Sequence, residues 1–195
     1  MDSRRLRKGL ILVLIGSIVL VVAYFSGIAI AKGIRNWNAG RMRAEQAEAI
    51  LERMGSGLGV GKSLPDAVLA DLEGIDTRLS DLLCDRTVIV FFRTDCSYSR
   101  AELAALKEAT ARPKDQSCFI LISHSDQAEI WVVKQSLGLT CPILYDRDKQ
   151  YGKQLGLMTA PLNFVVDKNL QIKEVIAGAM TAEDIAVLIG QTRKQ

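Results

Sequence analysis

Cys96 stands where an apolar segment gives way to a helix-like one, in the stretch FFRTDCSYSRAEL at residues 91–103. A cysteine at a helix N-terminus is favoured as a thiolate, because unpaired backbone N–H groups and the helix dipole stabilise negative charge. A thiolate can attack the disulfide of a partner and form a mixed disulfide. The pattern therefore predicts a reactive thiol, and the alternative is that Cys96 is a small buried apolar residue.

Ser99 takes the place, three residues further on, where a dithiol redox motif carries a second cysteine. A hydroxyl group is not oxidised to close a disulfide, but it can hydrogen-bond to the sulfur and stabilise the thiolate. We therefore predict Cys96 and Ser99 as the catalytic residues of a monothiol site. Of the neighbouring charges, Arg93 and Arg100 are expected to lower the pKa of Cys96, whereas Asp95 is expected to raise it.

The other three cysteines are predicted to lie away from Cys96. Cys84 precedes the strand that Cys96 follows, Cys118 begins a neighbouring strand expected to be parallel, and Cys141 follows a helix returning to that same edge. A strand of about six residues spans roughly 20 Å, whereas a disulfide needs Cα atoms within about 7 Å. We expect Cys118 and Cys141 to fill the core and Cys84 to lie in a surface turn. A Cys84–Cys118 disulfide is an open alternative.

The elements around Cys96 are those of an α/β domain. The apolar run at Thr87–Phe92 has the length of a strand buried on both faces. The other expected elements are a hairpin turning at Glu73–Gly74, a helical turn capped by Ser80, strands at 118–123, 143–145, 163–166 and 172–176, and helices at 97–110, 126–137, 149–155 and from Thr181. The last two strands are joined by a turn in which Asn169 is expected to be left-handed. This order predicts a central mixed sheet covered by helices on both faces.

The first part of the chain has a different composition from the rest. Residues 9–31 are uncharged and would reach roughly 34 Å as a helix, enough to cross a hydrocarbon core of about 30 Å. We predict a basic tail at 1–8, a transmembrane anchor at 9–31, a juxtamembrane helix with a glycine-rich linker at 32–61, and a domain at 62–195. A cleavable signal sequence with a site at Ala29–Ala31 is the alternative.

Basic residues flank the apolar segment on both sides, but they lie closer to it on the N-terminal side. Arg7 and Lys8 directly precede the segment, and Arg4 and Arg5 lie just before them. This distribution predicts a single pass through the cytoplasmic (inner) membrane with the N-terminus in the cytoplasm, and an extracytoplasmic domain, periplasmic in a Gram-negative cell.

The charge distribution argues against nucleic-acid binding. The formal charge is +3, but residues 1–61 carry nine Lys/Arg and four Asp/Glu, whereas residues 62–195 carry sixteen and eighteen. The basic excess is therefore beside the predicted membrane segment, where it favours anionic head groups. The stretch SGLGVGKS at 56–63 approaches a phosphate-binding loop, but no strand precedes it and Pro65 interrupts the following helix. His124 is the single histidine, so no metal site and no cofactor are expected.

Three segments resemble the TlpA/ResA-type thiol–disulfide oxidoreductases, a membrane-anchored, extracytoplasmic form of the thioredoxin fold within the redoxin superfamily. They are LPDAVLADLEGIDTRLSDL at 64–82, VIVFFRTDCSYSRAELAAL at 88–106, and LGLTCPILYDRDKQYGKQLGLMTAPLNFVVDKNLQIKEVIAG at 137–178. The resemblance, which covers about residues 65–188, implies a thioredoxin-like fold and places Pro161 as a cis-proline opposite Cys96. Ala160 would then present its backbone to an extended segment of a bound partner, with Tyr98 as a further contact.

The sequence departs from that family at three positions. Ser99 replaces the second active-site cysteine, Asp95 replaces a tryptophan, and Val90 stands where some thioredoxins have a buried acid. These departures leave the fold expectation intact but put the dithiol cycle in doubt. The expected function is thiol–disulfide exchange through Cys96 with protein thiols or disulfides, or with a low-molecular-weight thiol.

Two other functions are compatible with the same fold. One is a redox-inactive docking or assembly module in which Cys96 is incidental. The other is a peroxiredoxin-like peroxidase, which would need a P-x-x-x-[TS]-x-x-C pattern. Ile89 and Arg93 stand at its proline and hydroxyl positions, so the groups that orient peroxide are missing.

Overall fold

The computed structural model describes residues 21–28, 45–110 and 118–192. The chain divides into two compact units, Met1–Met42 and Arg43–Gln195. Of the predicted anchor at 9–31, only residues 21–28 are described, and they are helical. The basic tail at 1–8 lies outside the described residues. Within the described ranges, no helix combines the length and the apolar character needed to span a membrane.

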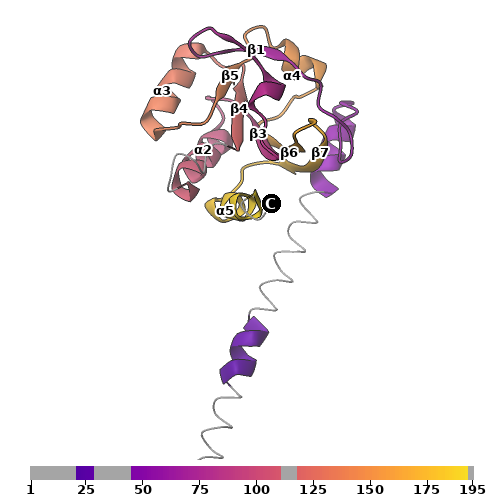
Figure 1. Ribbon diagram of the computed structural model, residues 1–195, viewed down its shortest axis with the longest axis vertical. Coiled ribbons are helices and arrows are strands. Elements are labelled where there is room, and N and C mark those ends of the chain that lie inside the picture. Colours follow the sequence, from indigo (N-terminus) through magenta and orange to yellow (C-terminus); the bar gives the residue numbers. More distant parts are fainter. Residues whose placement is uncertain (1–20, 29–44, 111–117, 193–195) are drawn as a thin grey trace, which may run out of the picture. The chain divides into compact units, whose positions relative to one another are not determined.

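The second unit is built on one mixed sheet (Figure 1). Its strands are β1 Val68–Asp71, β2 Asp76–Arg78, β3 Arg86–Phe92, β4 Phe119–Ser123, β5 Ile143–Tyr145, β6 Leu162–Asp167 and β7 Ile172–Ala177. They lie in the order β2-β1-β5-β4-β3-β6-β7. Strands β3, β4 and β5 pair in parallel, and the remaining pairs are antiparallel. The predicted mixed sheet, with the strand from Cys118 parallel to the strand before Cys96, is confirmed.

Helices cover both faces of this sheet, as the alternation of side chains along β3 requires. Val88, Val90 and Phe92 pack on one face, whereas Ile89 and Phe91 pack on the other. The first face is covered by α2 Ser97–Ala109, α3 Gln127–Leu137 and α5 Ala182–Thr192, and the second by the helix at residues 45–53 and by α4 Gln150–Gln154. A short 3-10 helix, η1 Leu79–Leu82, precedes β3. The prediction of a thioredoxin-like α/β architecture is confirmed.

Residues 45–64 belong to the domain, although the sequence predicted a juxtamembrane helix and linker up to residue 61. Ala47 and Leu51 are four residues apart on the helix at 45–53 and are fully buried in the core. The glycine-rich segment then lies along β7, where Gly61 N donates to Ile172 O (2.8 Å) and Ile172 N donates to Lys62 O (2.7 Å). Burial of this helix face explains why the compact unit begins before residue 62.

Two predicted turn details are wrong. Leu170, and not Asn169, has the left-handed backbone, with φ of 59°. The Asp167 carboxylate accepts from Asn169 N (2.9 Å), which fixes the first part of the turn and moves the bend to the buried Leu170. Ser80 lies inside η1 instead of capping it, and its hydroxyl group donates to Asp66 Oδ2 (2.9 Å).

Candidate active site

Cys96 is the N-cap residue of α2. Its backbone is extended (φ −91°, ψ 119°), and its carbonyl group accepts the first helical hydrogen bond from Arg100 N (3.0 Å). Strand β3 ends at Phe92, so only a short loop separates the buried strand from the thiol. The side chain is half-buried. The predicted position of Cys96 at a strand-to-helix junction is confirmed.

The Ala160–Pro161 loop lies directly opposite Cys96. The sulfur is 3.3 Å from the Ala160 carbonyl oxygen, to which the protonated thiol donates. The Ala160–Pro161 peptide bond is cis, as the sequence predicted. Antiparallel pairing of β3 with β6, in which Phe91 faces Leu162, holds the loop at this place. Residues far apart in the chain thus form the two sides of one site.

Ser99 is fully buried beneath the thiol. Its backbone N–H is the main cause of a lowered Cys96 pKa; its hydroxyl group and the Tyr98 N–H add to the effect, while burial and the Asp95 charge oppose it. The Ser99 hydroxyl oxygen accepts from Arg93 N (3.2 Å), which leaves its own hydrogen free to point at the sulfur. The expected lowering of the Cys96 pKa is confirmed, and its source is the first turn of α2.

Arg93 and Arg100 were expected to lower the pKa of Cys96, but both make their hydrogen bonds with other groups. Arg93 Nε donates to Asp95 Oδ1 (2.9 Å), and a second bond joins Arg93 Nη2 to Asp95 Oδ2. This ion pair holds the pKa of Asp95 below its usual value. Arg100 Nη1 donates to the Thr94 carbonyl oxygen (3.2 Å) instead of facing the sulfur. The backbone N–H groups of α2 therefore stabilise the thiolate more than the arginines do.

A second set of hydrogen bonds, which the sequence reasoning missed, fixes the loop before Cys96. Thr94 N donates to Ser125 Oγ (3.0 Å), and the Thr94 hydroxyl group donates to Glu129 on α3. Ser123 Oγ donates to Phe92 O (2.9 Å). These partners come from the end of β4 and the segment after it, so no local pattern in the sequence connects them to the cysteine.

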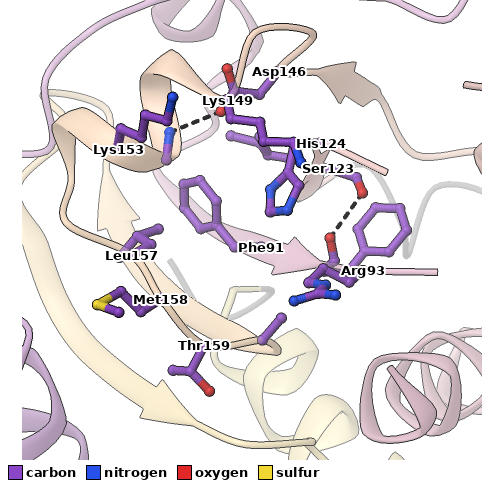
Figure 2. A pocket seen from close by; sticks show the side chains of 14 residues that line it. Phe91, Arg93, Ser123, His124, Asp146, Lys149, Lys153, Leu157, Met158 and Thr159 are labelled. Atoms are coloured by element: carbon purple, nitrogen blue, oxygen red, sulfur yellow. Dashed lines mark hydrogen bonds between the residues drawn. The ribbon is translucent and has the colours of Figure 1, made fainter. Parts of the chain in front are cut away.

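A pocket of about 230 Å³ opens beside the Cys96 site and shares Arg93 and Ala160 with it. Figure 2 shows Leu157, Met158 and Thr159 along one side of this pocket, with His124 and Lys149 on the opposite side. The full lining is Phe91, Phe92, Arg93, Ile122, Ser123, His124, Asp146, Lys149, Gly152, Lys153, Leu157, Met158, Thr159 and Ala160.

Positive side chains predominate in the lining of this pocket, because its single carboxylate is already hydrogen-bonded. Arg93, Lys149 and Lys153 are positive, and the one carboxylate, Asp146, is buried and accepts from Gly152 N (2.8 Å). Lys149, the N-cap residue of α4, has a left-handed backbone with φ of 56°, which is uncommon for a residue other than glycine. Burial, followed by the positive charges of Lys149 and Arg93, lowers the pKa of His124. His124 lies in the loop directly after β4 and lines this pocket.

The comparisons with known proteins agree with this geometry. Residues 60–175 match the AhpC/TSA family. Thiol-disulfide oxidoreductase ResA of Geobacillus thermodenitrificans is 35% identical over 128 residues, which are 65% of this chain and 74% of the relative. This chain belongs to the AhpC/TSA family and is a ResA/TlpA-like thioredoxin-fold protein.

Solved structures support the fold of this ResA/TlpA-like protein. StoA from Bacillus subtilis aligns with a TM-score of 0.52 at 21% identity, covering 64% of this chain and 96% of that one. A secreted Mycobacterium tuberculosis disulfide oxidoreductase, homologous to Escherichia coli DsbE, aligns with a TM-score of 0.55 at 15% identity, covering 64% and 95%.

Glu102 is a buried acid on α2 to which the sequence analysis assigned no role. It lies on α2 with Leu103 and Leu106 and lines the same small cavity as Val90. Burial raises the pKa of Glu102 to about 8. The Met180 N–H and the Asn163 amide oppose this rise, but neither makes a hydrogen bond of good geometry to the Glu102 oxygens. The sequence does contain a signal for this buried acid, because Glu102 stands on the apolar side of the predicted helix.

The remaining cysteines of this ResA/TlpA-like protein lie apart from Cys96. Cys141 is buried in the core, as predicted, and burial raises its pKa to about 12. Cys84 precedes β3 and Cys118 precedes β4, so both lie at the end of these parallel strands that is away from Cys96. Both are half-buried, whereas Cys118 was predicted to fill the core. Within the described part of the chain, no group of histidine, cysteine and acidic side chains is arranged to hold a metal ion.

Proposed function

We propose that this protein is a monothiol thiol–disulfide oxidoreductase in which Cys96 exchanges with the disulfides of partner molecules. The observation that carries the proposal is a thiol of lowered pKa at the start of α2, facing a cis-proline loop, with Ser99 where a resolving cysteine would stand. The name of the relatives, thiol-disulfide oxidoreductase, supports the same chemistry.

The proposed reaction has two exchange steps. The Cys96 thiolate attacks one sulfur of a partner disulfide, a Cys96–partner disulfide forms, and the other partner sulfur leaves as a thiolate that takes up a proton. Ser99 cannot attack this mixed disulfide. An external thiolate therefore attacks the sulfur of the bound partner, which releases a new disulfide and regenerates the Cys96 thiolate. Cys96 is neither oxidised nor reduced over the whole cycle.

An exposed surface around Cys96 supports a protein as one partner. The side chains of Tyr98 and Met158 are 69% and 83% exposed. They belong to the two segments that meet at the thiol, α2 and the loop before β6. We propose that an extended segment of the partner lies across Ala160 and Pro161, with Tyr98 as a flanking contact.

Membrane attachment is a separate part of the proposal and depends on the sequence of residues 9–31. We propose that this segment anchors the protein in the cytoplasmic membrane, with the domain outside the cytoplasm. Fractionation followed by protease digestion of intact spheroplasts tests it. Digestion of the domain in intact spheroplasts is expected, and protection from the protease would contradict the orientation.

The first prediction concerns the reactivity of Cys96. Iodoacetamide is expected to alkylate Cys96 with an apparent pKa below the ordinary value of about 8.5, because the α2 N–H groups stabilise the thiolate. The measurement is the rate of alkylation against pH, followed at Cys96 by peptide mass spectrometry. In the same protein, oxidised glutathione should give a mixed disulfide at Cys96 that persists until a thiol is added.

The Cys96→Ser variant is the matched control for this prediction, because it keeps the hydrogen-bonding capacity while it removes the nucleophile. Trapping of partner proteins from acid-quenched cells is expected with the unchanged protein and not with the variant. A Cys96 pKa at or above about 8.5, together with unaltered cellular function of Cys96→Ser, would instead favour a redox-inactive docking module.

The pocket next to Cys96 suggests which small thiol completes the cycle. The pocket is lined both by positive side chains and by Ala160, whose carbonyl oxygen contacts the sulfur. Arg93 is already paired with Asp95, whereas the ammonium groups of Lys149 and Lys153 form no ion pair within the described residues. We propose that these two lysines attract a thiol that carries carboxylates.

The second prediction is that Lys149→Gln/Lys153→Gln slows the reaction of glutathione with a Cys96 mixed disulfide about fivefold at low salt, because two favourable charge interactions are lost. Cys96 is first converted to a neutral pyridyl disulfide with dithiodipyridine. The glutathione thiolate attacks the Cys96 sulfur and displaces thiopyridone, whose absorbance reports how fast the charged thiol reaches the disulfide. The Cys96→Ser protein gives the background from other cysteines. The rate with uncharged 2-mercaptoethanol should not change.

Lys62→Gln/Lys168→Gln is the matched control for this prediction, since both lysines are exposed, neither lines the pocket, and the net charge changes equally. This control should keep the wild-type rate with glutathione. Equal slowing by both double variants would mean that only the overall charge matters. If the Lys149→Gln/Lys153→Gln protein reacted more slowly with glutathione and with 2-mercaptoethanol to the same extent, the lysines would support the fold of the site and not attract the charged thiol.

A further inference from the structure

Cys118 lies beside Thr87 at the end of β3 that is far from Cys96. Val88 pairs with Phe119 in parallel register, and Val88 N donates to Cys118 O (2.8 Å). One residue earlier on each strand, Thr87 and Cys118 therefore lie side by side. Neighbours in register point to the same face of a sheet, so the Cys118 side chain shares the face of the Thr87 side chain.

Cys84 is folded back onto that same face. Its backbone N–H donates to Thr87 Oγ1 (2.8 Å), and Thr87 is fully buried. The Thr87 hydroxyl group thus fixes Cys84 next to the position that Cys118 occupies. Burial, followed by the charge and the hydrogen bond of the neighbouring Cys118 thiol, raises the pKa of Cys84 to about 11.

We propose that Cys84 and Cys118 are a second redox site, which closes to an intramolecular disulfide independently of Cys96. The oxidant is a low-molecular-weight disulfide. The thiolate of one cysteine attacks it, forms a mixed disulfide and releases one small thiolate. The second cysteine then attacks the protein sulfur of that mixed disulfide and releases the other small thiolate. The two protein protons pass to the two small thiolates, and two electrons pass to the small disulfide.

The site differs in chemistry from the one at Cys96. A thiol with a raised pKa is rarely ionised at neutral pH, so it attacks slowly. The pair therefore suits a structural bond that forms slowly and persists. Because Cys84 precedes β3 and Cys118 precedes β4, the bond encloses β3 and α2, which carry the Cys96 loop between them. Closing such a loop restricts the unfolded chain and stabilises the fold.

The test uses the full chain with oxidised glutathione as the oxidant at mildly alkaline pH, acid quenching, and labelling of free thiols with N-ethylmaleimide. A non-reducing digest should contain a Cys84–Cys118 linked peptide. In Cys96→Ser two fewer thiols should be labelled after oxidation, and in the unchanged protein three fewer, because glutathione also blocks Cys96. The oxidised protein should melt about 5 °C above the reduced protein. The Cys96→Ser variant should keep both the linked peptide and the shift, whereas Cys84→Ser should lose both.

Glutathione found singly on Cys84 and Cys118, or both thiols still labelled after oxidation, would overturn the inference. So would a link that joins Cys96 to any other cysteine. The peptide map of the unchanged protein decides the matter even if Cys84→Ser fails to fold. Because the Cys96→Ser protein carries the test by itself, failure of monothiol exchange at Cys96 does not affect its outcome.

Discussion

Replacing Ser99 with cysteine is expected to convert the single-thiol site into a dithiol site and to accelerate release of Cys96 mixed disulfides at least about a hundredfold. The physical reason is that the resolving thiol becomes part of the same molecule. A well-placed intramolecular group reacts as if it were present at a very high concentration. No external thiol would then be needed for the second step.

The geometry around Ser99 supports this substitution. The Ser99 hydroxyl group is near enough to the Cys96 sulfur to help lower its pKa, so a sulfur at the same position would lie near it as well. Residue 99 is fully buried, and a thiol replaces a hydroxyl group with little change in shape. The hydrogen bond from Arg93 N (3.2 Å) to the hydroxyl oxygen would become a weaker bond to sulfur, which is a small loss beside the gain in reactivity.

The measurement is the lifetime of a peptide mixed disulfide at Cys96 without added thiol, followed by mass spectrometry. In Ser99→Cys the peptide should leave, and a disulfide between Cys96 and the introduced thiol should remain. Ser97→Cys is the matched control, because it adds a thiol in the same turn at an exposed position. Equal lifetimes in the unchanged protein and in Ser99→Cys would show that residue 99 cannot reach the bond, and the idea of a lost resolving position would fail.

Glu102→Gln is expected to make the protein more stable at pH 8 by about 4 kcal/mol, while leaving its stability near pH 4 almost unchanged. Burial raises the Glu102 pKa from 4.5 to about 8. In the unfolded chain the carboxyl group ionises at its ordinary value, whereas in the folded protein it keeps its proton. A neutral Glu102 can also donate to Asn163 Oδ1, which makes no hydrogen bond within the described residues.

The direction of the pH effect follows from proton binding. Between pH 4.5 and about pH 8 the folded state binds more protons at this residue than the unfolded state, so the free energy of unfolding falls as pH rises. Below this window both states are protonated, and above it both are ionised. The contribution of Glu102 is therefore complete at low pH and is lost as pH rises through the folded pKa.

Urea unfolding at several pH values measures this effect for the unchanged protein and for Glu102→Gln. The difference in the free energy of unfolding should grow across the window and then level off. Glu108→Gln is the matched control, since Glu108 is exposed on the same helix. A difference that stays constant with pH, or that shrinks as pH rises, would rule out a buried neutral carboxyl group.

The strand-to-helix junction at Cys96 was predictable because it is marked locally, whereas the facing position of Pro161 followed from the family resemblance. An apolar run of strand length ending at Phe92 fixes where the sheet stops, and the sequence after Cys96 favours a helix. The parallel strand from Cys118 followed from a second apolar run with a helix between. The sequence therefore predicted at which edge of the sheet each of these residues lies.

Contacts made across the fold were not predictable in the same way. Glycines before Lys62 indicate a flexible linker by composition, yet two backbone hydrogen bonds to Ile172 hold the segment in place. Sequence spacing put Cys84 and Cys118 at one edge of the sheet but did not show that Thr87 turns them toward each other. In each case the deciding partner is distant in the chain.

The backbone bonds between residues 61–64 and the start of β7 also affect how molecules meet. A strand at the border of a sheet offers unpaired N–H and carbonyl groups to which another chain can add, with aggregation as a frequent result. Here Ile172 and Leu170 are already paired with the chain's own Gly61–Leu64 segment, and the opposite border is β2, only three residues long. Pairing with another copy is thereby blocked at the start of β7 and limited to a short strand at the opposite border.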